Sequence, residues 1–461
     1  MYWSTTWDRS NLLAAISPTT PINFVTPGKI GSADIVVDDS TVYQTMAGFG
    51  ATLSKHPKIL PCVYKADSSV IADGSASLLS GLKSADATAY YTLLNYLFDP
   101  TDGANAGGLS YLRVPLGASD FSANIYSMDD MSGDTSFADF NIDAAPSYLF
   151  STIVDILTCL DEDLSYDERG LIGDFVCHPM SETMFTLCLT TLIEMRYKNE
   201  PENSNPSYPS TLVPAAIEAQ IGIALRSLMN ANGYSSVHLF GFEHNWNDST
   251  GYPVQLIQQA KGAFDSISFH CYGGTVDEQG DFQTLYPDID IYQTECTGML
   301  GTDWWSDIKW STNTLMIGAP NYFAKTAAMW NLALDGSGGP ELPGASSCIG
   351  GCRGVVTVND NGSYTFVAVL ISFNWLVDVY LARISVNQEF YAMAQASKAV
   401  LPKDAGGPWG QRIDVSIGGG SDWALVVGAY KTERLSPTDW NRYSLVVLNW
   451  QAYISQSRTS I

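Results

Sequence analysis

The sequence predicts an α/β protein: a (β/α)8 barrel, the TIM-barrel architecture, with a small β-sandwich domain built from the N- and C-terminal segments. Three observations lead to this fold class. Strand-like and helix-like segments alternate from Gly48 to about residue 345, which is typical of parallel strands joined by crossover helices. Short apolar strands with Gly-rich turns flank this region on both sides. No GxGxxG motif opens a helix, which disfavours a doubly wound nucleotide-binding sheet.

The individual elements support this fold in chain order. Residues 22–45 contain short strands separated by Pro and Gly. Residues 109–117 (LSYLRVPLG) form a strand that ends at a turn, and residues 217–233 (IEAQIGIALRSLMNANG) form an amphipathic helix closed by Asn and Gly. The next elements are a strand at 237–245, a helix at 254–263, and strands at 267–274 and 289–296.

The C-terminal part returns to β structure. From about Val386, apart from a helical run ending near KAVLPKD, short apolar strands alternate with Gly-rich turns. We therefore predict N-terminal strands of the β domain at residues 1–42, the barrel at 43–345, and the C-terminal part of the β domain at 346–461.

The composition excludes several classes of partner. The 48 Asp and Glu residues outnumber the 23 Lys and Arg residues, giving a formal net charge of -25. A surface with this much negative charge repels phosphate backbones and anionic lipids. We therefore expect no nucleic-acid partner. Aromatic residues make up 12% of the chain, including 12 Trp and 24 Tyr. Their rings stack on the apolar faces of sugars, which favours a carbohydrate ligand, although a barrel core rich in Trp and Tyr is an equal alternative.

Two features concern the location of the protein. Residues 367–384 approach the length of a transmembrane helix but contain Asn374, Asp378 and Arg383, so we expect no membrane span. Glycosylation sequons at Asn247 and Asn361 fit a secreted protein. The first ten residues lack the basic start and apolar run of a signal peptide. We expect an extracellular monomer.

The eight Cys residues form no CxxC pair, and the sequence contains no metal-binding motif. We therefore expect neither a metal nor a cofactor. Cys348 and Cys352 are the best disulfide candidates, because the Gly-rich loop between them can close so short a ring.

Polar side chains stand at four predicted strand ends, where active-site residues of such barrels gather. They are Asn199 and Glu200; Glu243, His244 and Asn245; His270 and Tyr272; and Glu295. Two carboxylates facing one another across the barrel mouth can hydrolyse an acetal, one donating a proton and the other attacking the anomeric carbon or activating water. Taken singly, Glu200 could be an exposed loop acid, Glu295 a strand-end acid paired to a neighbouring His or Lys, and His270 a core histidine bonded to backbone.

These residues lie within stretches that resemble glycoside hydrolase family 30, most closely its fungal endo-β-1,6-glucanase branch, which is related to the glucosylceramidases. The matching stretches run in family order. They are YQTMAGFGATL, YLRVPLGASDFSANIYS, YKNEPENSNPSYPS, FGFEHNWND, SISFHCYGG, IYQTECTG, AAMWNLALDGSGGP, CRGVVTVNDNGSY and NQEFYAMAQASKAV.

The resemblance implies a retaining mechanism through a covalent glycosyl-enzyme. It implies that Glu200 is the general acid and base, Glu295 the nucleophile and Asn199 a ligand of the sugar 2-hydroxyl, with Arg113 beneath the nucleophile. The positions that would hold the sugar are Asp120, His270, Tyr272, Trp330 and Asn245. For these roles Glu295 needs a low pKa and Glu200 a raised one. Retention requires carboxyl groups about 5 to 5.5 Å apart, and inversion about 6.5 to 9.5 Å.

Three functions remain open at this stage. A secreted hydrolase of β-1,6-glucan polymers or oligosaccharides is the first. A glucosylceramidase-type β-glucosidase is the second, and an apolar collar around the cleft would favour it. The third is a catalytically impaired, carbohydrate-binding relative.

Three segments depart from the family pattern and motivate the third function. Residues 54–72 and 367–386 read as insertions, and residues 151–198 lack the Pro-Trp-Ser-Pro-Pro segment that ends a barrel strand in relatives. The chain also ends before the last strands of the β domain that the resemblance implies. Our hypothesis is that the two insertions are translated introns and that the third segment is a frame or exon error.

We expect that the native protein lacks residues 54–72 and 367–386. Peptide mass mapping of protein purified from its natural source tests this hypothesis. Recovery of peptides from within either segment would refute it.

Overall fold

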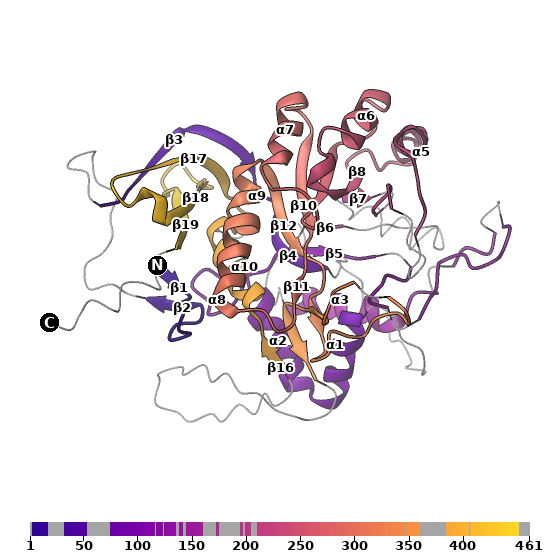
Figure 1. The fold of residues 1–461 in the computed structure, drawn as a ribbon, viewed down its shortest axis with the longest axis horizontal. Helices are drawn as coiled ribbons and strands as arrows, with labels where there is room; N and C mark the ends of the chain where they lie inside the picture. The colour runs from indigo at the N-terminus through magenta and orange to yellow at the C-terminus, as the bar shows by residue number, and fades with distance from the viewer. Residues whose placement is uncertain are drawn as a thin grey trace.

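The computed structural model describes residues 2–16, 32–52, 74–115, 117–122, 124–134, 138–141, 144–159, 172–174, 194–196, 199–203, 210–345, 347–359, 384–404 and 406–450. Its largest element is a barrel of parallel strands, with an antiparallel sheet at one side (Figure 1). The insertion at 54–72 lies outside the described residues, as do residues 367–383 of the second insertion and the chain after Trp450. Of segment 151–198 the structure describes 151–159, 172–174 and 194–196.

Eight parallel strands pair in one closed ring, in the order β4, β5, β6, β7, β8, β9, β10, β12 and back to β4. The strands are β4 (Gly48–Thr52), β5 (Tyr111–Arg113), β6 (Ile172–Asp174), β7 (Glu194–Arg196), β8 (His238–Asn245), β9 (Ser266–His270), β10 (Asp290–Glu295) and β12 (Ala324–Met329). A parallel barrel was predicted from the sequence. The crossover between β6 and β7 lies outside the described residues, so the full eightfold strand and helix alternation remains a prediction.

Helices surround this ring (Figure 1). They are α1 (Gly74–Ala85), α2 (Ala87–Phe98), α3 (Ser147–Cys159), α5 (Ala215–Ala231), α6 (Tyr252–Gln259), α7 (Glu278–Leu285), α8 (Trp304–Ser311), α9 (Gly318–Asn321) and α10 (Gln388–Val400). Short helical turns are η3 (Trp246–Asp248), η4 (Thr312–Met316) and η5 (Asp422–Ala424). None of the helices in the described part of the chain is both long and apolar enough to cross a membrane.

An antiparallel sheet of four strands joins the two ends of the chain. Its order is β19 (Arg442–Asn449), β18 (Leu425–Thr432), β17 (Gln411–Gly418) and β3 (Asp34–Thr45). The sequence predicted such a joint β domain, but a two-layered sandwich and the domain boundaries at 42 and 345 remain predictions. Helix α10 contacts β4, β18 and β19, and therefore lies between the barrel and this sheet (Figure 1).

Three smaller sheets complete the described strands. They are β1 (Tyr2–Ser4) with β2 (Ala14–Ile16); β11 (Gly298–Met299) with β14 (Cys352–Arg353); and β13 (Ala333–Leu334) with β15 (Val356–Val358) and β16 (Ile384–Val386). The pair of β11 with β14 lies next to the carboxyl end of β10 and so borders the barrel mouth.

Aromatic side chains fill the barrel interior. Tyr111, Phe240 and Tyr292 form one buried cluster with Ala47 and Ala328. The ring centroids of Phe240 and Tyr292 are 4.4 Å apart. The described side chains therefore pack the barrel interior, and we look for the site beyond the strand ends.

Two β-bulges turn polar side chains toward the barrel mouth. The register of β8 shifts between Gly241 and Glu243, and Phe242 there has a φ of 48°. Because of the extra residue, the side chain of Phe242 packs in the same core cluster as that of Leu239, outside the ring of strands. The side chain of Glu243 then turns toward the inside of the ring. A second shift, between Gln293 and Glu295 of β10, does the same for Glu295.

Strands β4 and β5 approach so closely that Gly50 is required. A Cβ at Gly50 would lie 1.7 Å from the carbonyl oxygen of Tyr111, which is backbone and cannot rotate away. We expect Gly50→Ala to lower the free energy of unfolding by about 3 kcal/mol or more, the upper range for overpacking. Urea unfolding followed by circular dichroism would measure it.

Gly81 provides the matched control, because a Cβ there meets nothing within 4 Å. It lies inside helix α1, so Gly81→Ala should raise the free energy of unfolding by about 0.5–1 kcal/mol. Equal effects of the two substitutions would contradict the packing of β4 against β5.

Candidate active site

The predicted site residues meet at the carboxyl end of the barrel strands. Asn199 and Glu200 follow β7, and Asn199 forms an isolated parallel bridge with Glu243 at the end of β8. The amide of Glu200 donates to the carbonyl oxygen of Glu243 at 2.8 Å. His270 ends β9 and Glu295 ends β10, and these two residues pair in register. The bulges and this pairing bring four strand ends to one point.

Arg113, at the end of β5, lies beneath the site and is 5% exposed. Its Nη1 donates to Oε2 of Glu295 at 2.5 Å, and its Nη2 donates to Oδ1 of Asn199 at 2.7 Å. The guanidinium also lies 4.8 Å from the centre of the Trp330 ring, within range for a cation–π interaction. A fixed guanidinium therefore holds the carboxylate of Glu295 and the amide of Asn199 in set orientations.

Glu200 is held by its backbone and by two neighbours. Its φ of 47° lies in the left-handed region, which is uncommon for a residue other than Gly and often marks functional sites. Its Oε2 accepts from Nδ2 of Asn203 at 2.9 Å, and its Oε1 lies 3.8 Å from Nδ1 of His270. The same Nδ1 lies 3.7 Å from Oε1 of Glu295.

The two carboxylates are close together. One oxygen of Glu200, one oxygen of Glu295 and one ring nitrogen of His270 lie within 4.8 Å of one another. This distance between single oxygens is compatible with the roughly 5 to 5.5 Å between the carboxyl groups of retaining pairs.

The ionisation of Glu200 differs from the sequence prediction. Burial alone would raise the pKa of Glu200, but the hydrogen bond and charge of His270 outweigh burial and lower it to about 2. Burial alone would also lower the pKa of His270, but three surrounding carboxylates raise it to about 9. The prediction of a raised pKa for Glu200 is therefore wrong, because His270 holds the proton.

Asp120 and Trp330 form one side of the site, next to the carboxyl end of β12. Nε1 of Trp330 donates to Oδ1 of Asp120 at 3.2 Å, and Oγ of Ser347 donates to Oδ2 at 2.5 Å. Burial is the main cause that raises the pKa of Asp120 to about 7, with the charge of Glu295 adding to it. Such a carboxyl group can donate or accept hydrogen bonds at neutral pH, which suits a sugar hydroxyl.

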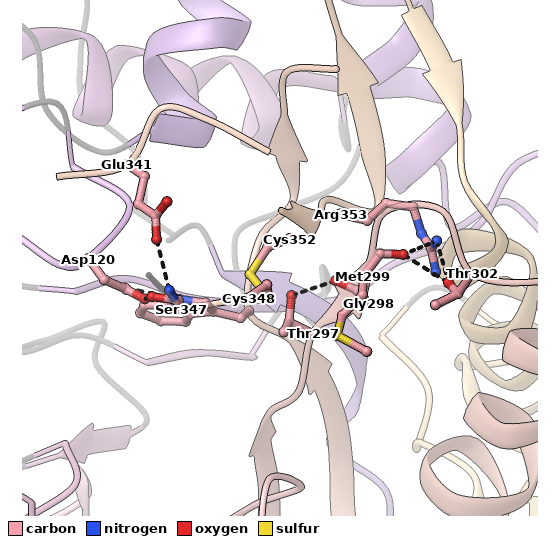
Figure 2. Close-up of a disulfide and its surroundings, with 11 residues drawn as sticks. Asp120, Thr297, Gly298, Met299, Thr302, Glu341, Ser347, Cys348, Cys352 and Arg353 are labelled. Atoms are coloured by element: carbon pink, nitrogen blue, oxygen red, sulfur yellow. Dashed lines mark hydrogen bonds between the residues drawn. A yellow bond between two sulfur atoms is a disulfide. The ribbon is translucent and has the colours of Figure 1, made fainter. Parts of the chain in front are cut away.

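The loop that carries Ser347 is closed by a disulfide. The structure joins Cys348 to Cys352, the pair expected from the sequence, across a Cα–Cα distance of 5.1 Å. Figure 2 shows this ring between Asp120 and the β11 residues Gly298 and Met299. The disulfide fixes the end of β14, and the amide of Ser347 donates to Glu341 at 2.9 Å. The loop therefore presents Ser347 to Asp120.

Tyr272 and Asn245 form the opposite side. The backbone amide of Tyr272 donates to Oδ1 of Asn245 at 3.0 Å, and the Tyr272 residue is 44% exposed. Loss of water around its hydroxyl and the charges of Glu295 and Asp120 raise the pKa of Tyr272 well above its ordinary value. An exposed ring whose hydroxyl end points to carboxylates can stack on a sugar and remain neutral.

Sequence reasoning missed two features of the site. Glu243 was noted at its strand end but not included among the site residues, although it is 1% exposed and contacts both Arg113 and His270. A second disulfide joins Cys271 to Cys296. Each of these Cys residues directly follows a polar strand-end residue, His270 or Glu295, and that spacing was the available signal.

The described part of the chain contains one group able to share a cation, formed by Glu200, His270 and Glu295. Arg113 already places a positive charge against Glu295, and the raised pKa of His270 makes its ring a second cation. These charges favour acid–base chemistry at the group, and a reaction without metal or cofactor remains a prediction.

The chain is similar in sequence and in fold to known proteins. The chain is 25% identical over 424 residues to endo-1,6-beta-D-glucanase neg1 of Aspergillus fumigatus, covering 82% of this chain and 75% of that protein. The chain resembles a fungal endo-1,6-β-glucanase along most of its length. The resemblance predicted from the motifs is thus confirmed, although the chain matches no family profile.

Two solved structures share the fold. The endo-beta1,6-glucanase BT3312 superposes with a TM-score of 0.71 at 20% identity, covering 97% of this chain and 92% of that chain. SrfJ from Salmonella typhimurium superposes with a TM-score of 0.69 at 15% identity, covering 97% and 91%. At these identities the likeness concerns the fold alone, and it covers nearly the whole chain.

The lowered pKa of Glu200 gives a testable dependence of stability on pH. A carboxyl group whose pKa is lowered in the folded state stabilises that state at pH values above its ordinary pKa of 4.5. This contribution is lost as the pH falls toward 2. We expect wild type to exceed Glu200→Gln in free energy of unfolding at pH 6, by a margin that shrinks at pH 3.5. Urea unfolding at both pH values measures the margin.

Glu433→Gln serves as the control for this experiment, because Glu433 is exposed just after β18. Its margin should be small at both pH values. A Glu200→Gln margin that stays constant between pH 3.5 and pH 6 would contradict the ion pair between Glu200 and His270.

Proposed function

We propose that this protein is a retaining glycoside hydrolase that cleaves β-1,6-glucan within the chain through a covalent glycosyl-enzyme. The close approach of Glu200 and Glu295 at the barrel mouth carries the proposal. Similarity to an endo-1,6-beta-D-glucanase over most of the chain supports the substrate. The proposal includes a secreted, monomeric protein that works without a metal or cofactor.

In the first step of this mechanism, Glu295 attacks the anomeric carbon while Glu200 protonates the leaving oxygen. The ion pair with Arg113 aims the Glu295 carboxylate, and Asn199, fixed by the same guanidinium, is in place to bond the sugar 2-hydroxyl. In the second step, Glu200 takes a proton from water, which attacks the glycosyl-enzyme and releases the sugar with its configuration retained.

The remaining residues are proposed to hold the sugar. Trp330 lies over Arg113 and beside Asp120, so that a ring stacked there would place its hydroxyls near the Asp120 carboxyl group. Tyr272 would contact the sugar from the side of β9, with Asn245 fixing its backbone. His270 lies between the two catalytic carboxylates, where it can meet a hydroxyl next to the anomeric carbon.

One observation favours a glucosylceramidase-type β-glucosidase as the second candidate. Ile349, in the disulfide-closed loop, is 98% exposed, and Met299 on β11 is 46% exposed. Figure 2 shows Met299 near the Cys348–Cys352 disulfide that closes this loop. Exposed apolar side chains suit contact with a lipid chain better than contact with a polar sugar.

We expect wild-type protein to release reducing sugar from linear β-1,6-glucan and Glu295→Gln to lose at least about 1,000-fold of that activity, because the nucleophile is removed. Proton NMR of the first product should show the β-anomer before mutarotation. An α-anomer would refute retention.

The controls separate the alternatives. Glu433→Gln removes an exposed carboxylate away from the barrel mouth and should retain full activity. Faster hydrolysis of a glucosylceramide in detergent than of the polymer would establish the second candidate. Binding of β-1,6-glucan without turnover by wild type would identify a catalytically impaired relative.

A further inference from the structure

Glu243 is a buried carboxylate that the proposed reaction does not use. It is 1% exposed, and hydrogen-bond donors converge on its Oε1. Oγ1 of Thr294 donates to Oε1 at 2.6 Å, and Nε2 of His270 lies 3.2 Å from it. Nη2 of Arg113 lies 3.5 Å away. Because burial of a charge is costly without such partners, this arrangement calls for an explanation.

The contact with Glu243 determines what the His270 ring can do. With Glu243 as the ionised acceptor, Nε2 of His270 carries the proton of this contact and donates it to Glu243. The other ring nitrogen, Nδ1, lies 3.8 Å from Oε1 of Glu200 and 3.7 Å from Oε1 of Glu295. The ring is 0% exposed, so Nδ1 faces the two catalytic carboxylates and no bulk solvent.

We propose that Glu243 is a positioning residue, which fixes the His270 ring so that its Nδ1 proton lies between the carboxylates of Glu200 and Glu295. This inference rests on the proposed function and deepens it. In this role Glu243 acts through the His270 ring, through the backbone of Glu200 and through its contact with Arg113.

The local fold supports this role. The bulge in β8 turns Glu243 inward, and the amide of Phe242 at the bulge donates to Oε1 of the buried Glu218 at 3.2 Å. The carbonyl oxygen of Glu243 accepts from the amide of Glu200. Its backbone therefore contacts the proposed general acid, while its side chain contacts the histidine between the two catalytic groups.

Several charged or titratable groups face His270. Glu200 approaches from the segment after β7, Glu243 from β8 and Glu295 from β10. The rings of His244 and Tyr272 have centroids 6.2 Å and 6.0 Å from that of His270. Arg113, from β5, lies beyond Glu243 and Glu295. The three carboxylates are the nearest of these groups, which accounts for the raised pKa of His270.

The arrangement conserves the proton that the reaction needs. Before substrate binds, the proton resides on Nδ1 of His270 and Glu200 is ionised. Nδ1 and Oε1 of Glu200 are 3.8 Å apart, so transfer of that proton requires one of the two side chains to move closer. The transfer leaves a neutral histidine with Nε2–H still bonded to Glu243, and produces the acid form of Glu200. After water has returned a proton to Glu200, the same transfer in reverse restores the free site with no net gain or loss.

The test is an NMR titration of histidines labelled with 15N in the ring, comparing wild type with Glu243→Gln. The chain has five His residues, and His270→Gln assigns the signal. We expect the pKa of His270 to fall by about one pH unit or more in Glu243→Gln, since one of its three carboxylates is lost. The alkaline limb of kcat should move to lower pH by a similar amount.

Glu389→Gln is the matched control, because Glu389 is also buried, at 2% exposure, but pairs with Arg353 and is not one of the groups that face His270. It should leave the His270 titration unchanged. If Glu243→Gln does not fold, wild type alone still tests the proposal, because both ring nitrogens of His270 should be protonated at pH 7.

Two results would overturn the inference: a neutral His270 ring in wild type at pH 7, or an unchanged His270 pKa in folded Glu243→Gln. The titration needs no turnover, so it stands apart from the proposed function. Absence of glucanase activity with the expected titration would refute the function alone. Glucanase activity together with an unchanged His270 pKa in Glu243→Gln would refute only the role of Glu243, and not the proposed function.

Discussion

The site depends on the balance of charge at a buried barrel mouth. Glu200, Glu243 and Glu295 converge there with little access to water, and their mutual repulsion would oppose folding if nothing offset it. Arg113 offsets it from below and His270 from within the group. The proposed chemistry uses the same positive charges that offset the repulsion within this cluster. Stability and activity therefore depend on one network.

The backbone geometry of the barrel strands allows these charged side chains to meet. Regular alternation along β8 and β10 would point the residues at Glu243 and Glu295 to the wrong side, and one extra residue in each strand corrects this. Beyond the bulges, the Cys271–Cys296 disulfide ties the ends of β9 and β10, and the carbonyl oxygen of Cys296 accepts from the amide of Trp330 at 2.7 Å. The strand ends are thus fixed to each other as well as to the barrel.

Much of this could be predicted from the sequence, and the exceptions have physical causes. Strand periodicity and polar strand ends located β8, β9 and β10 and brought Glu200, His270 and Glu295 into one region. The pKa of Glu200 could not be predicted, because it depends on a histidine 70 residues away along the chain. Bulges alter register by one residue, which alternation patterns do not reveal, so the inward turn of Glu243 was missed.

The sheet shared by both termini has a consequence for how the chain is made. Gln411 of β17 bonds Thr45 of β3 across a separation of 366 residues. At translation rates of about 5–20 residues per second, β3 waits roughly 20 to 70 s on the ribosome for its neighbour. During vectorial synthesis its edge is open to any other nascent strand. Chaperone demand for this protein should therefore be set by β3 rather than by the barrel.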